Sequence, residues 1–157
     1  MAWVSPTGHS DPDSGWTDET KAYDGNLATF AVSPGNQSDK YLVLTRSVLL
    51  CDKVRIFACW DEEGDEVDAE NCCVDVYYSG AWHNIFGGQY GETITANVWT
   101  EMEIGSTQTV TQARVKSGGR PTVIDFRVKE FEFNEVAAAA ARPLVGGSLA
   151  GGRKGLI

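Results

Sequence analysis

Few side chains in this sequence could act as acid–base catalysts near neutral pH. The sequence has two histidines, His9 and His83, and imidazole is the side chain whose unperturbed pKa lies closest to neutrality. Ser10 and Asp11 follow His9 directly, but a Ser-His-Asp triad needs members that converge from separate elements. The phosphate-binding patterns G-x-x-x-x-G-K-[ST] and G-x-G-x-x-G do not occur in the sequence. We therefore expect surface histidines and no enzymatic activity.

The four cysteines, Cys51, Cys59, Cys72 and Cys73, favour buried thiols over other uses. Cys72 and Cys73 are adjacent, so on a strand they point to opposite faces and cannot both reach one partner. No C-x-x-C spacing supports a zinc site. Two disulfides are the alternative, but four small buried thiols in a chain folded in a reducing cytoplasm are the favoured interpretation.

The charge is unevenly distributed along the chain. The sequence has 22 acidic and 13 basic residues, a formal charge of −9. Residues 137–157 contain three basic residues and no acidic one, whereas seven acidic residues fall within Asp61–Glu70. An acidic body argues against nucleic acid as a partner, because phosphate contacts need clustered Lys and Arg. The opposite signs suggest an intermolecular role, and a solvated loop with a free basic tail is the alternative.

The spacing of the strand signals predicts an all-β domain. A chain of 157 residues is long enough for one core, and the strand-like runs recur with turn residues between them. This pattern indicates an antiparallel β-sandwich over residues 1–136, followed by an extended Gly-rich tail over 137–157. No apolar run approaches membrane-spanning length and no secretory signal is recognisable, so we expect neither membrane insertion nor signal-directed secretion. The expected strands are Tyr41–Thr45, Lys53–Ala58, Cys73–Tyr78, Trp82–Phe86, Val98–Ile104, Gln112–Lys116 and Val123–Phe133.

The last predicted strand changes parity along its length. Phe126 and Val128 share one parity, whereas Phe131 and Phe133 share the other. A regular strand keeps one parity on the core face, so the simplest resolution is a β-bulge near Lys129-Glu130. A strand with a core on both faces is the alternative.

The segment GWTDETKAYDGNLATF, residues 15–30, resembles the galactose-binding-like jelly rolls, which include discoidin (factor 5/8 C-type) domains and related carbohydrate-binding modules. Four later segments resemble strands of these domains in the same order: Leu42–Leu44, VRIFA, VDVYYSGAW and the closing KEFEFNEV. The resemblance spans about residues 10–136. It implies a jelly-roll β-sandwich.

The resemblance also implies one structural Ca²⁺ between the Asp-Gly-Asn-x-x-Thr loop and the last strand. All the implied ligands are oxygens, which Ca²⁺ prefers, and Gly25 would permit the tight turn of the loop. The alternative is an ordinary turn in which Asp24 bonds its own backbone and Thr29 caps it. The implied ligands are the side chains of Asp24, Thr29 and Glu130 and the carbonyls of Lys21, Asn26, Thr29 and Lys129.

Sugar-binding relatives use aromatic and polar side chains in loops at one end of the sandwich. The groups available for such a site here are Trp60, Trp82, His83, Asn84, Tyr90 and Arg120, of which Trp82, His83, Trp60 and Arg120 are the candidates. Trp82 and His83 lie at a predicted hairpin tip, which would expose one of them. Relatives commonly bury a Trp at the position that Trp82 matches, so a core Trp82 is the favoured interpretation and a sugar platform is the alternative.

The tail favours assembly as the main functional hypothesis. Its glycines would allow close approach, and its apolar and basic side chains would contact a partner; its ending also resembles those of small phage structural proteins. We expect a structural or decorating subunit of a virion, made in the host cytoplasm, that docks on other virion proteins and on copies of itself. A carbohydrate-binding adhesion module that recognises surface glycan is the alternative, and an accessory domain of a hydrolase is the weakest one. The candidate contact residues are Arg142, Leu144, Val145, Leu149, Arg153, Lys154, Leu156 and Ile157.

Overall fold

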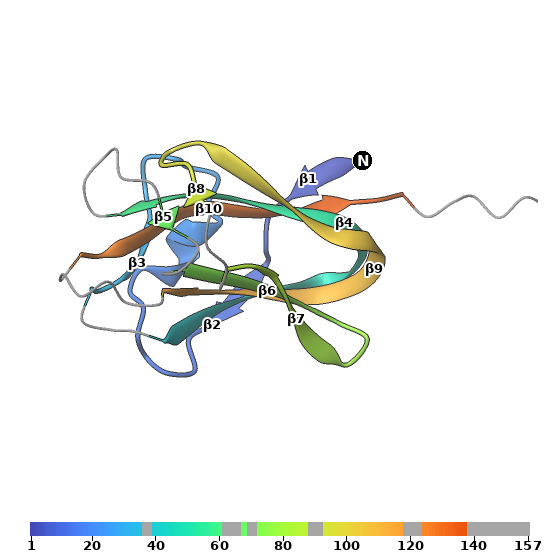
Figure 1. Ribbon diagram of the computed structural model, residues 1–157, viewed down its shortest axis with the longest axis horizontal. Helices are drawn as coiled ribbons and strands as arrows, with labels where there is room; N and C mark the ends of the chain where they lie inside the picture. Colours follow the sequence, from blue (N-terminus) through green and yellow to red (C-terminus); the bar gives the residue numbers. More distant parts are fainter. Residues whose placement is uncertain (36–38, 61–66, 69–71, 88–92, 118–123, 138–157) are drawn as a thin grey trace, which may run out of the picture.

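The computed structural model describes residues 1–35, 39–60, 67–68, 72–87, 93–117 and 124–137. These residues form antiparallel strands and a short 3-10 helix, η1, at Glu19–Ala22 (Figure 1). The strands are β1 (Ala2–Val4), β2 (Gly8–Ser10), β3 (Ala31–Ser33), β4 (Lys40–Trp60), β5 (Val67–Asp68), β6 (Cys72–Tyr78), β7 (Ala81–Phe86), β8 (Thr93–Ile94), β9 (Trp99–Ser117) and β10 (Phe126–Glu135). Among the described residues, no helix is long and apolar enough to cross a bilayer.

Two long strands, β4 and β9, connect the layers of the sandwich. Both curve at the same end of the molecule (Figure 1). Each covers two segments predicted as separate strands, and the β4–β9 ladder shifts register between Thr45 and Leu49 and between Cys51 and Lys53. These irregularities accompany the bend that carries one strand from one layer into the other. The predicted breaks between the segments are therefore wrong, because the chain bends there without leaving the sheet.

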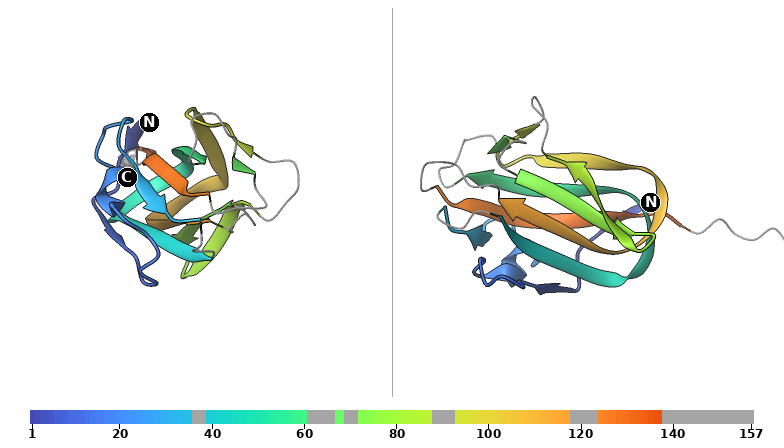
Figure 2. Two further views of the ribbon diagram at one scale, coloured as in Figure 1. Left: turned by 90° about the vertical axis from the view of Figure 1, so that its left-hand side faces the viewer. Right: turned by 60° about the horizontal axis from the view of Figure 1, so that its bottom comes forward.

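The first half of β4 and the second half of β9 form one layer with β2, β6 and β7. The second half of β4 and the first half of β9 form the other layer with β1, β3 and β10. Apolar side chains from the inner faces of both layers meet in a single core, and the strands surround it in the end-on view of Figure 2. The predicted all-β antiparallel sandwich is confirmed.

The change of parity in the last strand is a β-bulge, as predicted. Val128 lies opposite Ala58 and Glu130 lies opposite Phe57, so Lys129 is the extra residue of β10. The bulge lets Phe126 and Val128 before it, and Phe131 and Phe133 after it, all point into the core. Glu130 lies on the outer face, where η1 and the following loop cover it.

All four cysteines carry free thiols. Cys51, Cys59 and Cys72 are buried and Cys73 is half-buried. Burial raises the pKa of the Cys51 thiol to about 11, so this thiol stays protonated at neutral pH. The favoured interpretation of the cysteines as small buried side chains agrees with their placement.

Candidate functional site

The loop from Asp24 to Thr29 is closed by its own side chains. Asp24 Oδ1 accepts a hydrogen bond from the Asn26 N–H at 2.9 Å, and Asp24 Oδ2 accepts one from the Thr29 hydroxyl at 2.7 Å. Gly25 has φ +77°, the left-handed region that glycine adopts without steric cost. The loop therefore forms the turn expected as the alternative to a metal site, in which Asp24 bonds the backbone and Thr29 caps it.

Glu130 reaches this loop from the bulge of β10. Its Oε1 atom accepts hydrogen bonds from the N–H groups of Gly25 at 2.5 Å and Asn26 at 3.1 Å. Glu130 as a whole is only 3% exposed, and its Oε2 atom has no hydrogen-bond partner among the described residues. Burial raises the pKa of Glu130 to about 7; the neighbouring Asp24 carboxylate adds to this effect and the two N–H groups oppose it.

The donor set around Glu130 fits a hard cation. A buried carboxylate oxygen without a partner costs folding free energy, and a bound cation would remove that cost. The carboxylates of Asp24 and Glu130, the Thr29 hydroxyl and the Asn26 carbonyl, which accepts from that hydroxyl at 2.9 Å, offer oxygen atoms, which suits Ca²⁺. No group of three or more His, Cys, Asp or Glu side chains that could hold a metal ion is found in the described part of the chain, and this loop supplies two carboxylates.

The predicted ligand-binding residues do not converge on one site. Trp60 is 0% exposed and packs against Phe126 at 5.4 Å between ring centroids, so the structure contradicts its use as a sugar platform. The ring of His83 stacks on Tyr78, with centroids 3.8 Å apart. Arg120 lies outside the described residues, as do 61–66 and 69–70 of the acidic stretch and the tail residues 138–157 with every predicted contact residue.

Trp82 lies on the outer face of β7 and is half-buried, so it is not part of the core. The Arg114 guanidinium carbon lies 4.4 Å from the Trp82 ring centroid and 3.9 Å from the Tyr41 ring centroid. Tyr77 packs edge-on against Trp82 at 5.3 Å. The structure thus surrounds Trp82 with residues that the sequence analysis did not single out.

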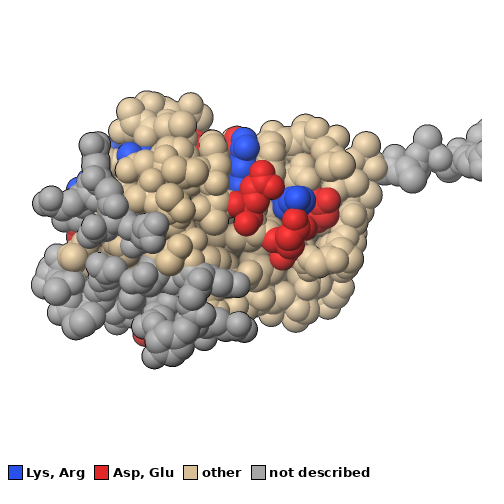
Figure 3. Space-filling model, turned by 45° about the horizontal axis from the view of Figure 1, so that its top comes forward, with Lys and Arg blue, Asp and Glu red and all other residues tan. Residues whose placement is uncertain are grey.

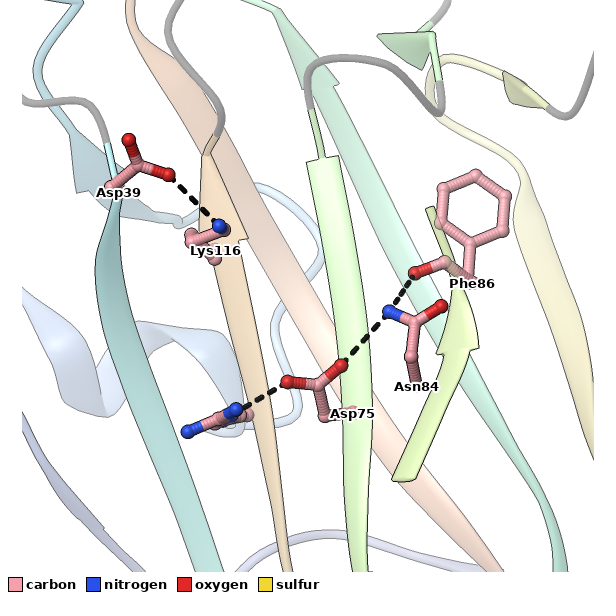
Figure 4. A network of polar contacts seen from close by, with 6 residues as sticks. Asp39, Asp75, Asn84, Phe86 and Lys116 are labelled. Atoms are coloured by element: carbon pink, nitrogen blue, oxygen red, sulfur yellow. Dashed lines mark hydrogen bonds and ion pairs between the residues drawn. The ribbon is translucent and has the colours of Figure 1, made fainter. Parts of the chain in front are cut away.

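Asp75 holds Arg114 in place between the two rings. Asp75 Oδ2 accepts a hydrogen bond from Arg114 Nε at 2.7 Å, and Asp75 Oδ1 accepts one from Asn84 Nδ2 at 2.9 Å (Figure 4). Asp75 is 6% exposed. Its position as a charged residue between apolar neighbours in the run VDVYY is the sequence feature that could have indicated its role. Its partners come from β7 and β9 and depend on strand order, which the sequence does not show.

The histidine near the N-terminus takes part in a different contact from the one that a triad would need. His9 Nδ1 lies 2.7 Å from the Tyr23 hydroxyl. The Asp11 carboxylate instead accepts hydrogen bonds from the N–H groups of Gly15 at 3.1 Å and Trp16 at 2.8 Å. Asp11 therefore shapes the backbone before Trp16.

Comparison with solved structures identifies the fold. A family 32 carbohydrate-binding module of AlyQ, in complex with 4,5-unsaturated mannuronic acid, matches with a TM-score of 0.62 and 14% identity, over 87% of this chain and all of that one. The galactose-bound family 32 module of NanJ from Clostridium perfringens matches with a TM-score of 0.58 and 10% identity, over 80% and 90% of the two chains. The chain has the galactose-binding-like jelly-roll fold.

A third solved structure extends the range of ligands found on this fold. Chitosan-binding module 1 of a Paenibacillus sp. IK-5 chitosanase/glucanase matches with a TM-score of 0.59 and 17% identity, over 83% of this chain and 96% of that one. No protein-family model and no curated protein matches the sequence. Since the identities lie between 10% and 17%, the likeness establishes the jelly-roll fold predicted from the sequence and nothing about the ligand.

Proposed function

We propose that this jelly roll is a non-enzymatic carbohydrate-binding module. The proposal is supported by the fold, which the chain shares with modules that bind galactose, a mannuronic acid derivative and chitosan. A fold alone does not give a function, so the proposal also needs a surface suited to sugars. The observation that carries it is Trp82, a large aromatic ring held outside the core beside Arg114 and Tyr41.

Aromatic rings and hydrogen-bonding groups are the two features that sugar recognition needs. The C–H faces of a sugar ring pack against aromatic surface, while its hydroxyl groups need donors and acceptors in fixed positions. Trp82 and Tyr41 supply the first feature, and Arg114 and Asn84 supply the second.

The expected virion role receives no support from the solved structures. That hypothesis rested on the basic, Gly-rich tail, and residues 138–157 of the tail lie outside the described part of the chain. The sugar-binding alternative is therefore the better supported of the two functional hypotheses.

A structural Ca²⁺ in the loop of Asp24 is also part of the proposal. The side chains of Asp24, Thr29 and Glu130 and the carbonyls of Lys21, Asn26, Thr29 and Lys129 would hold the ion. Its charge would offset the two carboxylates and fix the loop against β10.

A glycan array tests the function directly. The full chain, loaded with Ca²⁺, is applied to immobilised alginate, galactan, chitosan and mammalian-type glycans. Saturable binding to a subset that the heat-unfolded protein does not bind supports the proposal. Absence of saturable binding to every member of the array would reject it.

A further inference from the structure

We propose that the outer face of β4, β9, β6 and β7 is the saccharide-binding surface, and that it takes an internal stretch of an extended polysaccharide rather than a chain end. This inference rests on the proposed function and adds the location of the site and the form of the ligand. We call the residues that carry it the sheet-face cluster: Tyr41, Asp75, Tyr77, Trp82, Asn84 and Arg114.

Strand register places the cluster on one side of the sheet. Arg114 of β9 lies opposite Asp75 of β6, and Asp75 lies opposite Asn84 of β7. Directly opposed residues of an antiparallel ladder share a face, so the three side chains form one row across three strands. Tyr77 and Trp82 form the next row, in register with Gln112 of β9.

Arg114 has hydrogen-bonding capacity left for a ligand. Its Nε atom is taken up by Asp75, at 2.7 Å. Within the described residues, its two terminal nitrogens make no hydrogen bond or ion pair. The rings of Tyr41 and Trp82 hold the guanidinium from two sides, and a rigid, planar guanidinium can donate two parallel hydrogen bonds.

Asn84 supplies an acceptor beside this donor. Its Nδ2 atom donates to Asp75 Oδ1 and to the Phe86 carbonyl, both at 2.9 Å. These two bonds fix the amide so that its Oδ1 atom points away from Asp75 (Figure 4). Since a sugar hydroxyl both donates and accepts, an ordered donor and an ordered acceptor near aromatic rings suit it.

The buried Asp75 carboxylate indicates more than a solvated sheet surface. Only 6% of Asp75 is exposed although it lies on the outer face, and removing a charge from water costs free energy unless the charge is paired. The ordering of Arg114 and Asn84 is thus already in place before a ligand arrives, which lowers the entropy cost of binding.

The opposite face of the sandwich provides a contrast. Arg55 lies 4.4 Å from the Trp3 ring centroid and 4.1 Å from that of Trp99, an arrangement similar to that of Arg114. However, Glu132 accepts from Arg55 Nε at 2.6 Å and also pairs with its terminal Nη2. Two of the three guanidinium nitrogens of Arg55 are therefore occupied within the protein.

Neighbouring ion pairs on that opposite face confirm the difference. Lys53 Nζ lies 2.8 Å from Glu103 and 3.7 Å from Glu101. Figure 3 shows acidic and basic side chains next to one another on one face of the molecule. Charged groups that are paired with one another have few hydrogen-bonding atoms left for a ligand. The opposite face therefore serves as a matched control.

The shape of the cluster favours a chain-internal ligand. It extends over four adjacent strands, which span about 14 Å at the usual interstrand spacing. Two pockets, of about 410 Å³ and 270 Å³, lie elsewhere, one lined by Ile85, Phe86, Thr93 and residues 100–103, the other next to β1. Among the described residues the cluster forms a strip across the sheet, and a strip gains contacts with each sugar unit added along it.

The experiment compares variants of the two faces. Affinity for the polysaccharide bound best on the array, and for its monosaccharide and hexasaccharide, is measured by isothermal titration for wild type, Trp82→Ala, Arg114→Lys and the control Trp99→Ala. Arg114→Lys keeps a positive charge next to Asp75 but removes the planar guanidinium that can donate two parallel hydrogen bonds. We expect both sheet-face variants to bind the hexasaccharide about tenfold more weakly or worse, while Trp99→Ala binds like wild type. Melting temperatures establish that each variant is folded.

The outcomes separate this inference from the proposed function. Wild type that binds no array member overturns both. Wild type that binds, with affinity unchanged in Trp82→Ala and Arg114→Lys, overturns the sheet-face site and leaves the function standing. A monosaccharide bound as tightly as the hexasaccharide overturns the chain-internal form of the ligand. Hexasaccharide affinity that is lost in the sheet-face variants alone, and that is unchanged when the reducing end is modified, supports the inference.

Discussion

Arg114 and Asp75 form an ion pair of 2.7 Å across β9 and β6, on the outer face of the sheet, with the Asp75 carboxylate almost inaccessible to solvent. The two residues are 39 positions apart in the sequence. Asp75 also accepts from Asn84, so a single carboxylate ties together β9, β6 and β7. The stability of the sheet and the order of the proposed site thus depend on the same residue.

Replacing Asp75 by Ala should lower the free energy of unfolding by about 2 kcal/mol, because Arg114 and Asn84 both lose a hydrogen bond to a charged partner. Urea unfolding measures the change. The control is Asp39→Ala, which removes the ion pair to Lys116 from a carboxylate whose side chain is 70% exposed. An exposed pair contributes at most about 1 kcal/mol, so equal effects of the two substitutions would contradict the assigned role of Asp75.

The raised pKa of Glu130 predicts a pH dependence for the calcium-free protein. Glu130 titrates at about 7 in the folded chain and at 4.5 without the shift, so between these values the folded state holds the proton more tightly. Its contribution to stability is therefore complete below about pH 4.5 and falls as the pH rises to about 7. In EDTA, the free energy of unfolding of wild type should fall by up to about 3 kcal/mol relative to that of Glu130→Gln as the pH rises across this range. Urea unfolding at each pH measures the difference. A difference between the two proteins that does not change with pH would contradict the shift.

Calcium should reverse the order of the melting temperatures of wild type and Glu130→Gln. At pH 7.5 without metal, Glu130→Gln should melt above wild type, since glutamine avoids the cost of a buried charge. With millimolar Ca²⁺, wild type should gain several degrees and exceed the variant, because only the folded state binds the ion. Scanning calorimetry with and without Ca²⁺ makes the comparison, and Mg²⁺ at the same concentration controls for ionic strength. An unchanged melting temperature of wild type would reject the calcium site.

Gly87, which directly follows β7, should tolerate no side chain. A Cβ atom on Gly87 would lie 2.1 Å from the Cys72 carbonyl oxygen, a position that requires the backbone to move. Gly87→Ala should destabilise the domain by more than about 3 kcal/mol. Gly80→Ala provides the control, since Gly80 also has a positive φ but open space around it, and about 1 kcal/mol is expected there. Chemical unfolding that gives similar losses for both would show that the packing of β7 on β6 is looser than described.

The bulge predicts that the register of the core depends neither on the side chain of Lys129 nor on its presence. Lys129→Ala should change the free energy of unfolding by less than about 0.5 kcal/mol, because the side chain is half-exposed and lies at the extra position. Deleting Lys129 should leave the fold intact, because Val128 opposite Ala58 and Glu130 opposite Phe57 would then follow one another in a regular ladder. Circular dichroism and proton NMR dispersion report whether the deletion variant folds. A deletion variant that lacks native spectra would contradict the assignment of Lys129 as the extra residue.

The local features of this chain could be predicted from the sequence, whereas contacts between distant strands could not. The parity change between Val128 and Phe131 predicted the bulge, because alternation is a property of a single strand. The link between Asp24 and Glu130 followed from a family resemblance. The burial of Trp60 could have been predicted too, since it shares parity with Val54, Ile56 and Ala58, all of which are in the core.

The partners of Trp82 had no comparable signal. Tyr41, Arg114 and Trp82 lie on β4, β9 and β7, and they meet only because β9 lies between β4 and β6 in the sheet. Strand order and register are set by the whole core, so no short segment contains them. The continuity of β4 was missed for a related reason: a bend between layers and a turn between strands have similar local sequences.

The most direct test of saccharide binding at the sheet face is an NMR titration of ¹⁵N-labelled protein with the hexasaccharide identified on the array. The chain has five tryptophans, and their indole N–H signals report separately on the core and on the two outer faces. We expect the Trp82 indole and the amides of Asp75, Asn84 and Arg114 to shift in a saturable manner, while the Trp3 and Trp99 indoles stay in place. Shifts confined to other parts of the chain, or no shift at saturating ligand, would contradict the account.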